Sequence, residues 1–300
     1  MRHPLLKAHS EVRKRMIAVL REGLLVRRAG NLIFVCGGND DVHLRPIFCK
    51  YLTNNAPDYK VFQPEFAMKN YFSDEHGGQL DLGKFEELVG ELSHAIVIFP
   101  EAPGSFAETG YFSKTLPLAR KTILVLNSQY QSNDSFIMMG PARRIEEVSK
   151  FNPNLQIDFK NPDFSAVLKR IQRFDLPKTR KSLDFEDLSD YDLFCLIYKI
   201  FDMLIVATYE DLVTVFNSLT TGHAPKRQIK DVASILVGAG FVERVGEFGH
   251  YACLPVGQSL IKVRDGWAGE EFGLKLEISD ILRQSSAEFA GLLEERSDAD

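Results

Sequence analysis

Short apolar runs alternate with amphipathic segments through the first half of the chain. Each run has the length of a buried strand, and the runs are 32–36, 59–62, 95–99 and 122–126. Apolar residues recur at helical spacing between them, which predicts helices over 44–52, 82–92, 106–116 and 137–150. Strands that alternate with helices form a parallel sheet with right-handed crossovers. We therefore expect an α/β domain with a parallel sheet over residues 31–165.

The pattern changes after residue 188. Three helical segments are expected at 190–207, 209–219 and 225–237, and two short strands at 241–245 and 250–254. Helices followed by a hairpin have the order of a winged helix. We therefore expect an α+β, winged-helix-like domain over residues 189–300. Its acidic tail, from residue 294 onward, is expected to be disordered.

Charge is distributed unevenly along the chain. The net charge of −5 argues against general nucleic-acid coating, but residues 1–30 carry +6 and the remainder −11. Residues 10–28 have the spacing of an amphipathic helix, which is either a solvated outer helix or a docking surface for nucleic acid or an acidic partner. Six more basic residues fall between 169 and 181, in a basic linker expected over 166–188. Their charge can also bind phosphate.

Cysteine usage and hydropathy indicate a cytoplasmic protein. The four cysteines lack metal-binding or Cys-x-x-Cys spacing, and Cys36 and Cys195 lie in apolar runs typical of buried thiols. The first residues lack the apolar region of a signal peptide. Charged residues interrupt the longest apolar stretch, 191–209. We therefore expect no membrane-spanning segment and no metal site.

Candidate chemistry concentrates in residues 96–112, Ile-Val-Ile-Phe-Pro-Glu-Ala-Pro-Gly-Ser-Phe-Ala-Glu-Thr-Gly-Tyr-Phe. A strand ends at Pro100-Glu101, a turn follows, and a helix is expected to carry Glu108 in its first turn. Open α/β sheets bind ligands at the carboxyl ends of their strands, so both acids are expected at a binding site. This combination indicates chemistry on a nucleotide sugar.

Glu108 has two interpretations. Ser105-Phe-Ala-Glu108 fits the S-x-x-E capping box, in which Glu108 only stabilises the helix. Gly110 favours a catalytic role, because glycine inside a helix costs about 1 kcal/mol and is accepted where something packs closely. Gly104 permits the same approach from the other side. We therefore predict that Glu108 is the nucleophile or base at C1′ of a ribose, with Gly104, Ser105 and Gly110 at the substrate.

Glu101 and the end of the first strand complete the predicted site. Glu101 is either an exposed loop acid or a residue that orients the base or the ribose hydroxyls. Cys36, Gly37 and Gly38 end the first strand, where free N–H groups can bind phosphate, although a tight turn needs the same glycines. The two glycines lack GxGxxG spacing, which disfavours a dehydrogenase.

Two further segments are candidates for substrate binding. Residues 135–141 form either a packed, capped helix start or a helix amino terminus that binds an anion, with Ser135 and Gly140 at the site. Aromatic residues after the second strand either line a base pocket or belong to the core; these are Phe66, Tyr71 and Phe72.

A possible nucleic-acid surface lies in the second half of the chain. Lys226, Arg227 and Lys230 stand near the start of the helix expected over 225–237, which would be the recognition helix of a winged helix. Basic side chains in that place can meet phosphates or base edges. A winged helix can equally dock a protein, and the three residues can also be simply solvated.

Three blocks of sequence carry a resemblance to a known family. They are Ile-Phe-Val-Cys-Gly-Gly (33–38), Phe-Pro-Glu-Ala-Pro-Gly-Ser-Phe-Ala-Glu-Thr-Gly-Tyr-Phe-Ser (99–113) and Ser-Phe-Ile-Met-Met-Gly-Pro (135–141). In order and spacing they resemble the retron-associated effectors built on a nucleoside 2-deoxyribosyltransferase-like domain. The resemblance is strong over residues 31–150 and loose after 185. It implies a Rossmann-like, deoxyribosyltransferase-like fold for the first domain.

The resemblance also implies roles for the two acids. In the deoxyribosyltransferases, the glutamate that matches Glu108 is the nucleophile that forms a glycosyl-enzyme ester, and an acid in the place of Glu101 touches the nucleobase. The wider family has Asp-x-Gly-Thr before this helix, where this chain has Ala-Pro-Gly-Ser-Phe (102–106). That departure disfavours ordinary deoxyribosyl exchange and agrees with the retron subgroup, whose members are described as N-glycosidases acting on NAD+ or related nucleotides.

The expected activity is hydrolysis of NAD+ to nicotinamide and ADP-ribose, with NAD+ as substrate and no cofactor. Nicotinamide leaves as a neutral molecule, so a single essential glutamate without an obvious acid partner suits NAD+. The resemblance implies an anti-phage toxin held inactive by a retron reverse transcriptase and multicopy single-stranded DNA. It also implies a homo-oligomer or filament, because such sites are often completed by a neighbouring subunit.

Two alternatives stay open at this point. The first is an N-glycosidase or deoxyribosyltransferase that acts on free nucleosides or nucleotides. The second is a nucleic-acid-binding regulator whose first domain only senses a nucleotide.

Overall fold

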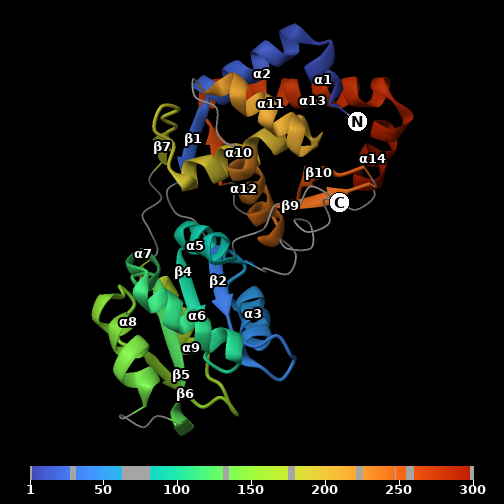
Figure 1. Ribbon diagram of the computed structural model, residues 1–300. Coiled ribbons are helices and arrows are strands. Elements are labelled where there is room, and N and C mark those ends of the chain that lie inside the picture. Colours follow the sequence, from blue (N-terminus) through green and yellow to red (C-terminus); the bar gives the residue numbers. More distant parts are fainter. Residues whose placement is uncertain are drawn as a thin grey trace. The chain divides into compact units, whose positions relative to one another are not determined.

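The structure, a computed structural model, describes residues 2–27, 32–62, 82–130, 135–174, 180–220, 226–246, 248–254 and 260–297. The chain divides into two compact units (Figure 1). We call residues 32–62 and 82–174 the sheet unit, and residues 2–27 and 180–297 the helical unit. No helix among these residues has the length and apolar character needed to cross a bilayer.

A five-stranded parallel sheet forms the centre of the sheet unit. Its strands are β2 (Leu32–Cys36), β3 (Lys60–Phe62), β4 (Ala95–Ile98), β5 (Thr122–Asn127) and β6 (Leu155–Ile157). Its helices are α3 (Leu44–Asn55), α5 (Leu82–Leu92), α6 (Pro103–Lys114), α7 (Leu116–Ala119), α8 (Arg143–Val148) and α9 (Ser165–Gln172), with the short turns η1 (Ser128–Tyr130) and π-helical η2 (Met138–Ala142). The predicted α/β class is confirmed.

Strand order places a ligand crevice within this sheet. The order β3-β2-β4-β5-β6 reverses between β2 and β4, because the chain moves from β2 out to β3 and then returns past β2 to β4. Open α/β sheets bind ligands beyond the carboxyl ends of the strands at such a switch point. The crevice is therefore expected between Cys36, which ends β2, and the residues after Ile98 of β4.

Helices cover both faces of the sheet, and the period of two along a strand decides which side chains each face presents. Ile33 and Val35 face α3 and α9, where they join one apolar core with Phe48 and Ile171. The alternate residues face α5 and α6, and Phe34 lies 6.0 Å from Phe112 of α6, centroid to centroid. Cys36 lies two residues beyond Phe34, so its side chain points toward α5 and α6.

The helical unit combines residues from both ends of the chain. Its helices are α1 (Pro4–Lys7), α2 (Ser10–Glu22), α10 (Asp190–Leu204), α11 (Tyr209–Leu219), α12 (Lys226–Gly238), η3 (Asp265–Trp267), α13 (Ala268–Ser285) and α14 (Ala287–Ser297). Its strands are β1 (Leu24–Arg27), β7 (Arg180–Ser182), β8 (Val206–Ala207), β9 (Val242–Val245), β10 (His250–Cys253) and β11 (Ile261–Val263). They form two antiparallel sheets, β11-β1-β7 and β8-β10-β9.

The order α10, α11, α12 and the hairpin β9–β10 agrees with the helices and strands predicted for this region, whereas strand β8 was not predicted. The winged-helix interpretation of that order stays a prediction. One boundary differs, because α10 stops at Leu204 rather than continuing to Ala207. Ile205 has a φ of 67°, which a β-branched residue rarely adopts, and the two residues after it pair with β10.

The amino-terminal helix ends earlier than predicted, at Glu22, and Leu24–Arg27 form strand β1. Its arginines are used within the unit. Arg13 donates to the carbonyl of Leu6, Arg15 pairs with Glu270 and Glu277, and Arg21 donates to the last carbonyls of α11. This pattern favours an outer helix fastened to its neighbours over a free docking surface.

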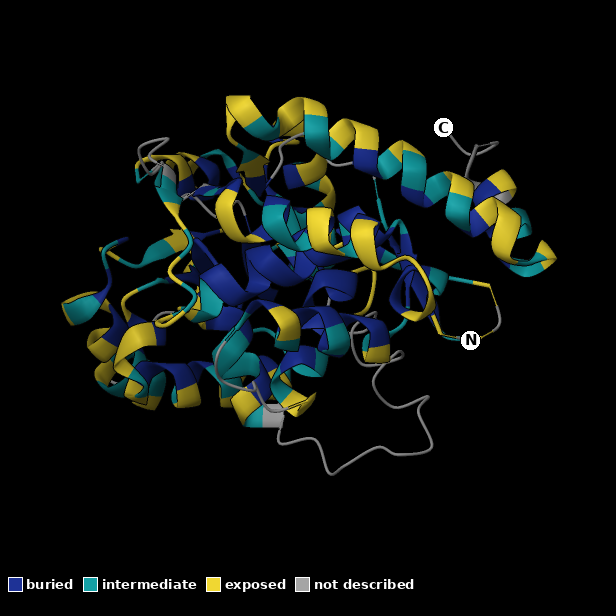
Figure 2. Cartoon of the chain, turned by 90° about the horizontal axis from the view of Figure 1, so that it is seen from above, coloured by how far each residue is buried: buried dark blue, intermediate teal, exposed yellow. Residues whose placement is uncertain are grey.

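Two other segments differ from the expected domain division. Within the linker expected over 166–188, residues 165–172 form α9 and residues 180–182 form β7. The acidic tail expected to be disordered from residue 294 is helical as far as Ser297, and residues 298–300 lie outside the described part. Phe289 and Leu292 are buried and hold α14 in place, which local composition does not indicate. Figure 2 shows buried and exposed residues alternating along the outer helices.

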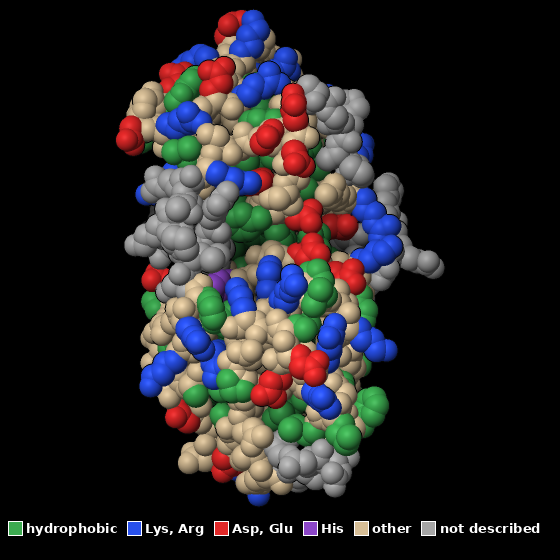
Figure 3. Space-filling model, turned by 90° about the vertical axis from the view of Figure 1, so that its left-hand side faces the viewer, with side chains coloured by type: hydrophobic (Ala, Val, Ile, Leu, Met, Phe, Trp, Pro, Cys, Tyr) green, Lys and Arg blue, Asp and Glu red, His purple; other side chains and the backbone are tan. Residues whose placement is uncertain are grey.

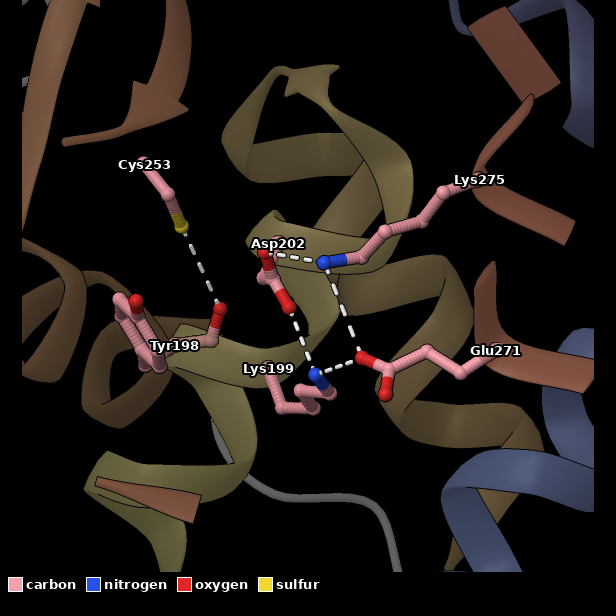
Figure 4. A network of polar contacts seen from close by, with 6 residues as sticks. All are labelled: Tyr198, Lys199, Asp202, Cys253, Glu271 and Lys275. Atoms are coloured by element: carbon pink, nitrogen blue, oxygen red, sulfur yellow. Dashed lines mark hydrogen bonds and ion pairs between the residues drawn. The ribbon is translucent and has the colours of Figure 1, made fainter. Parts of the chain in front are cut away.

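A buried ionic network joins α10 to α13 (Figure 4). Lys199 Nζ lies 2.7 Å from Asp202 Oδ2 and also contacts Glu271, and Lys275 Nζ lies 2.7 Å from Asp202 Oδ1. The Lys199 side chain is only 6% exposed. Burial opposes the charge of Asp202, yet Lys199 and Lys275 hold the pKa of its carboxyl below the usual range.

We expect Lys199→Met to destabilise the helical unit by about 2–3 kcal/mol, because it leaves buried carboxylates short of a cation. Denaturant unfolding followed by fluorescence of Trp267, the single tryptophan, reports on this unit. Lys14→Met is the control, since the Lys14–Glu11 pair is exposed and should be worth less than about 1 kcal/mol. Equal losses in both variants would show that the buried network contributes nothing special.

Candidate active site

The turn after β4 is built around Ser105. Its Oγ accepts hydrogen bonds from the N–H groups of Glu101 (3.1 Å) and Ala102 (3.0 Å). Helix α6 starts at Pro103, with Ala102 at the N-cap and Ser105 in the third helical position. The predicted capping box is therefore wrong: Ser105 is not the N-cap residue. Glu108 lies in the second turn rather than the first, so the helix start does not require it.

Glu101 holds the neighbouring strand end in place. Its Oε1 accepts from the N–H groups of Gly38 (3.1 Å) and Arg45 (3.2 Å), and its Oε2 accepts from that of Leu44 (2.8 Å). These donors belong to the loop after β2 and to the first turn of α3. The Gly38 N–H, predicted to be free for phosphate, is thus occupied by a carboxylate of the chain itself.

The two glycines after β2 are required by packing. A Cβ on Gly37 would come within 2.7 Å of Arg45 Cβ and 2.8 Å of Glu101 Oε1, and one on Gly38 would lie 2.3 Å from the His43 ring. Close packing of Arg45, Glu101 and His43 thus explains both glycines without a ligand. By contrast, a Cβ on Gly104 or Gly110 would meet nothing within 4 Å, so packing among the described residues does not explain these glycines.

Glu108 faces the end of β2 across the sheet surface. It lies one turn before Phe112, which packs on Phe34, so it shares that helix face and lies nearer the carboxyl edge. Burial, the charge of Glu108 and a hydrogen bond to Glu108 raise the pKa of the Cys36 thiol. Cys36 therefore stays protonated and serves as a partner of Glu108 rather than as a nucleophile.

A second carboxyl, Glu86, joins this group from α5. Helix α5 runs against the strands, as α6 does, so its first turns also lie at the carboxyl edge. Partial burial and the charge of Glu108 raise the pKa of Glu86 to about 7. A carboxyl whose pKa lies near 7, beside a second carboxyl, is the arrangement found where one group donates a proton and the other acts as nucleophile or base.

Sequence reasoning missed Glu86. It stands in Phe85-Glu86-Glu87-Leu88, an ordinary mixture for an amphipathic helix, and nothing in that pattern separates it from Glu87. In the structure Glu87 instead accepts a hydrogen bond from the Tyr111 hydroxyl at 2.5 Å. Only the placement of α5 beside α6 brings Glu86 to Glu108.

The remaining predicted substrate-binding residues belong to other segments. Ser135 caps the start of the η2 segment, where its Oγ accepts from the Met138 N–H at 3.4 Å, and η2 packs against α6. Gly140 is half-buried in that segment. Phe66, Tyr71 and Phe72 lie outside the described residues.

The three basic residues on α12 belong to the helical unit and are partly engaged there. Lys226 Nζ lies 3.4 Å from Glu210 Oε2 in an exposed pair, and Lys230 Nζ lies 5.9 Å from the centre of the Tyr209 ring. Their expected contact with nucleic acid stays a prediction. In the described part of the chain, no group of three or more His, Cys, Asp and Glu side chains is arranged to hold a metal ion.

Comparison with known proteins gives this geometry a family. Residues 41–244, about two thirds of the chain, match the family described as "STM3845 retron effector protein". The chain belongs to this family of retron effectors. The match includes Glu86, Glu101 and Glu108, and continues from the sheet unit through α12.

Two relatives from Escherichia coli share part of the sequence. The "Retron Ec86 putative ribosyltransferase/DNA-binding protein" is 35% identical over 122 residues, which cover 40% of this chain and 38% of that protein. The "Retron Ec73 putative ribosyltransferase/DNA-binding protein" is 29% identical over 136 residues, 42% of each chain. The aligned part thus spans about two fifths of each relative.

The pKa of Glu86 makes a prediction for stability. Because the folded state raises this pKa from 4.5 to about 7, the protonated carboxyl stabilises the fold below the lower value, and that contribution is lost as pH rises to about 7. We therefore expect Glu86→Gln to be more stable than the wild type at about pH 8, by roughly 1–2 kcal/mol after allowance for partial exposure. Near pH 4.5 the advantage should vanish.

Calorimetric unfolding across this pH range tests the expectation, with Glu87→Gln as the matched control on the same helix. A pH-independent difference between Glu86→Gln and the wild type would show that the carboxyl of Glu86 is not held protonated by its surroundings.

Proposed function

We propose that this retron effector cleaves the N-glycosidic bond of a nucleotide, with Glu108 acting at C1′ of the ribose. The observation that carries the proposal is that Glu86 and Glu108 interact beside the switch point of the sheet, where burial and the charge of Glu108 raise the pKa of Glu86 to about 7. The names of the Ec86 and Ec73 relatives, which include ribosyltransferase, support the same class of reaction.

Glu108 either stabilises positive charge on the ribose or forms a covalent ester. As the bond from C1′ to the base breaks, the sugar becomes oxocarbenium-like, and a carboxylate beside C1′ lowers the energy of that state. If the Glu108 oxygen then bonds to C1′, water attacks the ester in a second step and releases the sugar and a proton. The Cys36 thiol, hydrogen-bonded to Glu108, would hold the carboxylate in position.

NAD+ is the substrate that we favour. Its nicotinamide leaves as a neutral molecule, so departure needs no proton, and water supplies the hydroxyl of ADP-ribose while one proton is released. Gly104, one turn before Glu108 on the same face of α6, carries no Cβ, which allows a close approach of the sugar. Pyrophosphate would have to bind elsewhere than at the Gly38 N–H, because Glu101 occupies it.

A second substrate class is favoured by Glu86. From the sequence, NAD+ is favoured because Glu108 has no obvious acid partner. In the structure, Glu86 is a candidate for that partner. A carboxyl with a pKa of about 7 can protonate a purine or pyrimidine as it leaves, which unactivated nucleosides and nucleotides need. A nucleotide N-glycosidase or deoxyribosyltransferase is therefore the alternative.

In the cell, we propose, the activity serves anti-phage defence. A retron reverse transcriptase and its multicopy single-stranded DNA would hold the effector inactive until infection. Family membership supports an association with retron components, and the DNA-binding part of the relatives' names supports a nucleic-acid partner. A regulator without catalysis would remain fully active in cells as Glu108→Gln, which separates the two explanations.

Glu108→Gln should lower turnover of the true substrate by roughly 10³-fold or more, because the amide carries no charge to stabilise the sugar cation. The full chain, alone and with its retron components, is incubated with NAD+ and with a nucleotide panel, and the released bases are followed by mass spectrometry. Glu87→Gln is the control and should keep wild-type turnover. Full activity of Glu108→Gln would refute the assignment.

Glu86→Gln separates the two substrate classes. With NAD+ the loss should stay below about tenfold, whereas a substrate with an unactivated base should lose roughly 10²–10⁴-fold, because only that base must be protonated. In the second case the wild-type rate should also fall as pH rises above about 7. A large loss with NAD+ would mean that Glu86 does more than donate a proton to the leaving group.

A further inference from the structure

Four basic side chains meet at the amino-terminal edge of the sheet, the edge opposite Glu108. Lys121 comes directly before β5, Lys150 lies between α8 and β6, and Arg170 and Arg173 lie at the end of α9. We call these four residues the basic edge. They come from three separate segments, so only Arg170 and Arg173 belong to the basic run visible in the sequence.

Aromatic rings tie the basic edge together. Lys150 Nζ lies 4.6 Å from the centre of the Phe151 ring and 5.9 Å from that of Phe174, and Arg173 Cζ lies 5.4 Å from the Phe174 ring. The two rings contact each other edge to face at 5.3 Å. Two cations therefore share one ring, which places their charges close together.

The like charges act on one another. Burial, followed by the charge of Lys150, lowers the pKa of Lys121 to about 8, and burial with the charge of Arg173 lowers that of Arg170. Within the described part of the chain, none of the four forms an ion pair with a carboxylate, although the charge of Glu91 acts on Lys121. An anion bound here would relieve this repulsion.

Two of the four side chains donate hydrogen bonds to backbone carbonyls, and the other two contact aromatic rings. Lys121 donates to the carbonyls of Gly90 and Glu91, and Arg170 donates to those of Phe151, Asn152 and Pro153. Arg173 is exposed and Lys150 is half-buried, and their side chains contact the rings of Phe151 and Phe174. Lys150 and Arg173 are thus the pair placed to meet a ligand.

We propose that the basic edge binds the phosphate backbone of a nucleic-acid strand. Four cations brought together at one edge from three segments can neutralise several phosphates of a nucleic-acid strand at once. Phe151 is buried and Phe174 is covered by cations, so bases have no open ring to stack on, and binding should depend little on base sequence. Figure 3 shows Lys and Arg side chains gathered on part of the sheet unit.

The assignment goes beyond the proposed glycosidase and does not depend on it. The basic edge and Glu108 lie at opposite ends of the β-strands. A nucleic-acid strand could therefore bind at the basic edge without covering Glu108. It also differs from the contact expected through Lys226, Arg227 and Lys230 of α12, and the experiment distinguishes the two surfaces.

The test is fluorescence anisotropy with labelled single-stranded DNA of mixed sequence, titrated with the full chain carrying Glu108→Gln so that turnover cannot interfere. Lys150→Glu/Arg173→Glu should weaken binding at low salt by about tenfold or more and reduce the slope of log K against log salt by roughly 1. Lys150→Gln/Arg173→Gln should show the same direction with a smaller loss.

The matched control is Arg143→Glu/Arg144→Glu, an equal change in charge on exposed residues of α8 in the same unit. It should keep most of the affinity, and unfolding curves should match those of the parent. Equal losses in both double variants, or loss only in Lys226→Glu/Arg227→Glu, would overturn the proposal. So would displacement of the DNA by poly-glutamate at equal charge, because the surface would then recognise an acidic polypeptide as well.

Discussion

The carboxyl edge of the sheet depends on the hydrogen bonds that the carboxylate of Glu101 accepts. Three backbone N–H groups from the loop after β2 and the first turn of α3 converge on its two oxygens, while Ser105 fixes its own N–H. One side chain therefore joins the ends of two neighbouring strands to the starts of two helices. An acid in a loop after a strand looks like a ligand contact, but here it replaces the anion that such a helix amino terminus would otherwise attract.

With that loop in place, charge arrangement decides the chemistry. Glu86 and Glu108 approach each other from two helices that both run against the strands, and the Cys36 thiol adds a protonated partner from β2. Partial burial and the charge of Glu108 raise the pKa of Glu86 to about 7, so this carboxyl gains a proton as pH falls through neutrality. The same physical constraint that raises this pKa thus supplies a candidate acid.

The sheet unit also separates its charges by edge. Carboxyls gather at the carboxyl ends of the strands, and the cations of the basic edge gather at the amino ends. If both proposals hold, separation along the strands would let a small nucleotide and a nucleic-acid strand bind at once without competition. In the helical unit, oppositely charged side chains pair with one another in the interior and hold α10 against α13. They are Lys199, Asp202, Glu271 and Lys275.

The sequence by itself determined the alternation of strands and helices, because apolar period and run length are local properties. Strands β2, β4 and β5, helix α5 and the placing of Glu101 and Glu108 near a strand end were all readable in that way.

The tertiary structure alone decided what those acids do. Glu86 is an unremarkable surface acid until α5 packs beside α6, and the capping box of Ser105 fails because α6 starts at Pro103. Strand β1 pairs with β7 and with β11, and each pair joins residues more than 150 positions apart. No local pattern specifies such partners. Electrostatic interactions, the protonation of side chains and the pairing of strands distant in the sequence all depend on neighbours in space. A chain acquires those neighbours only when it folds.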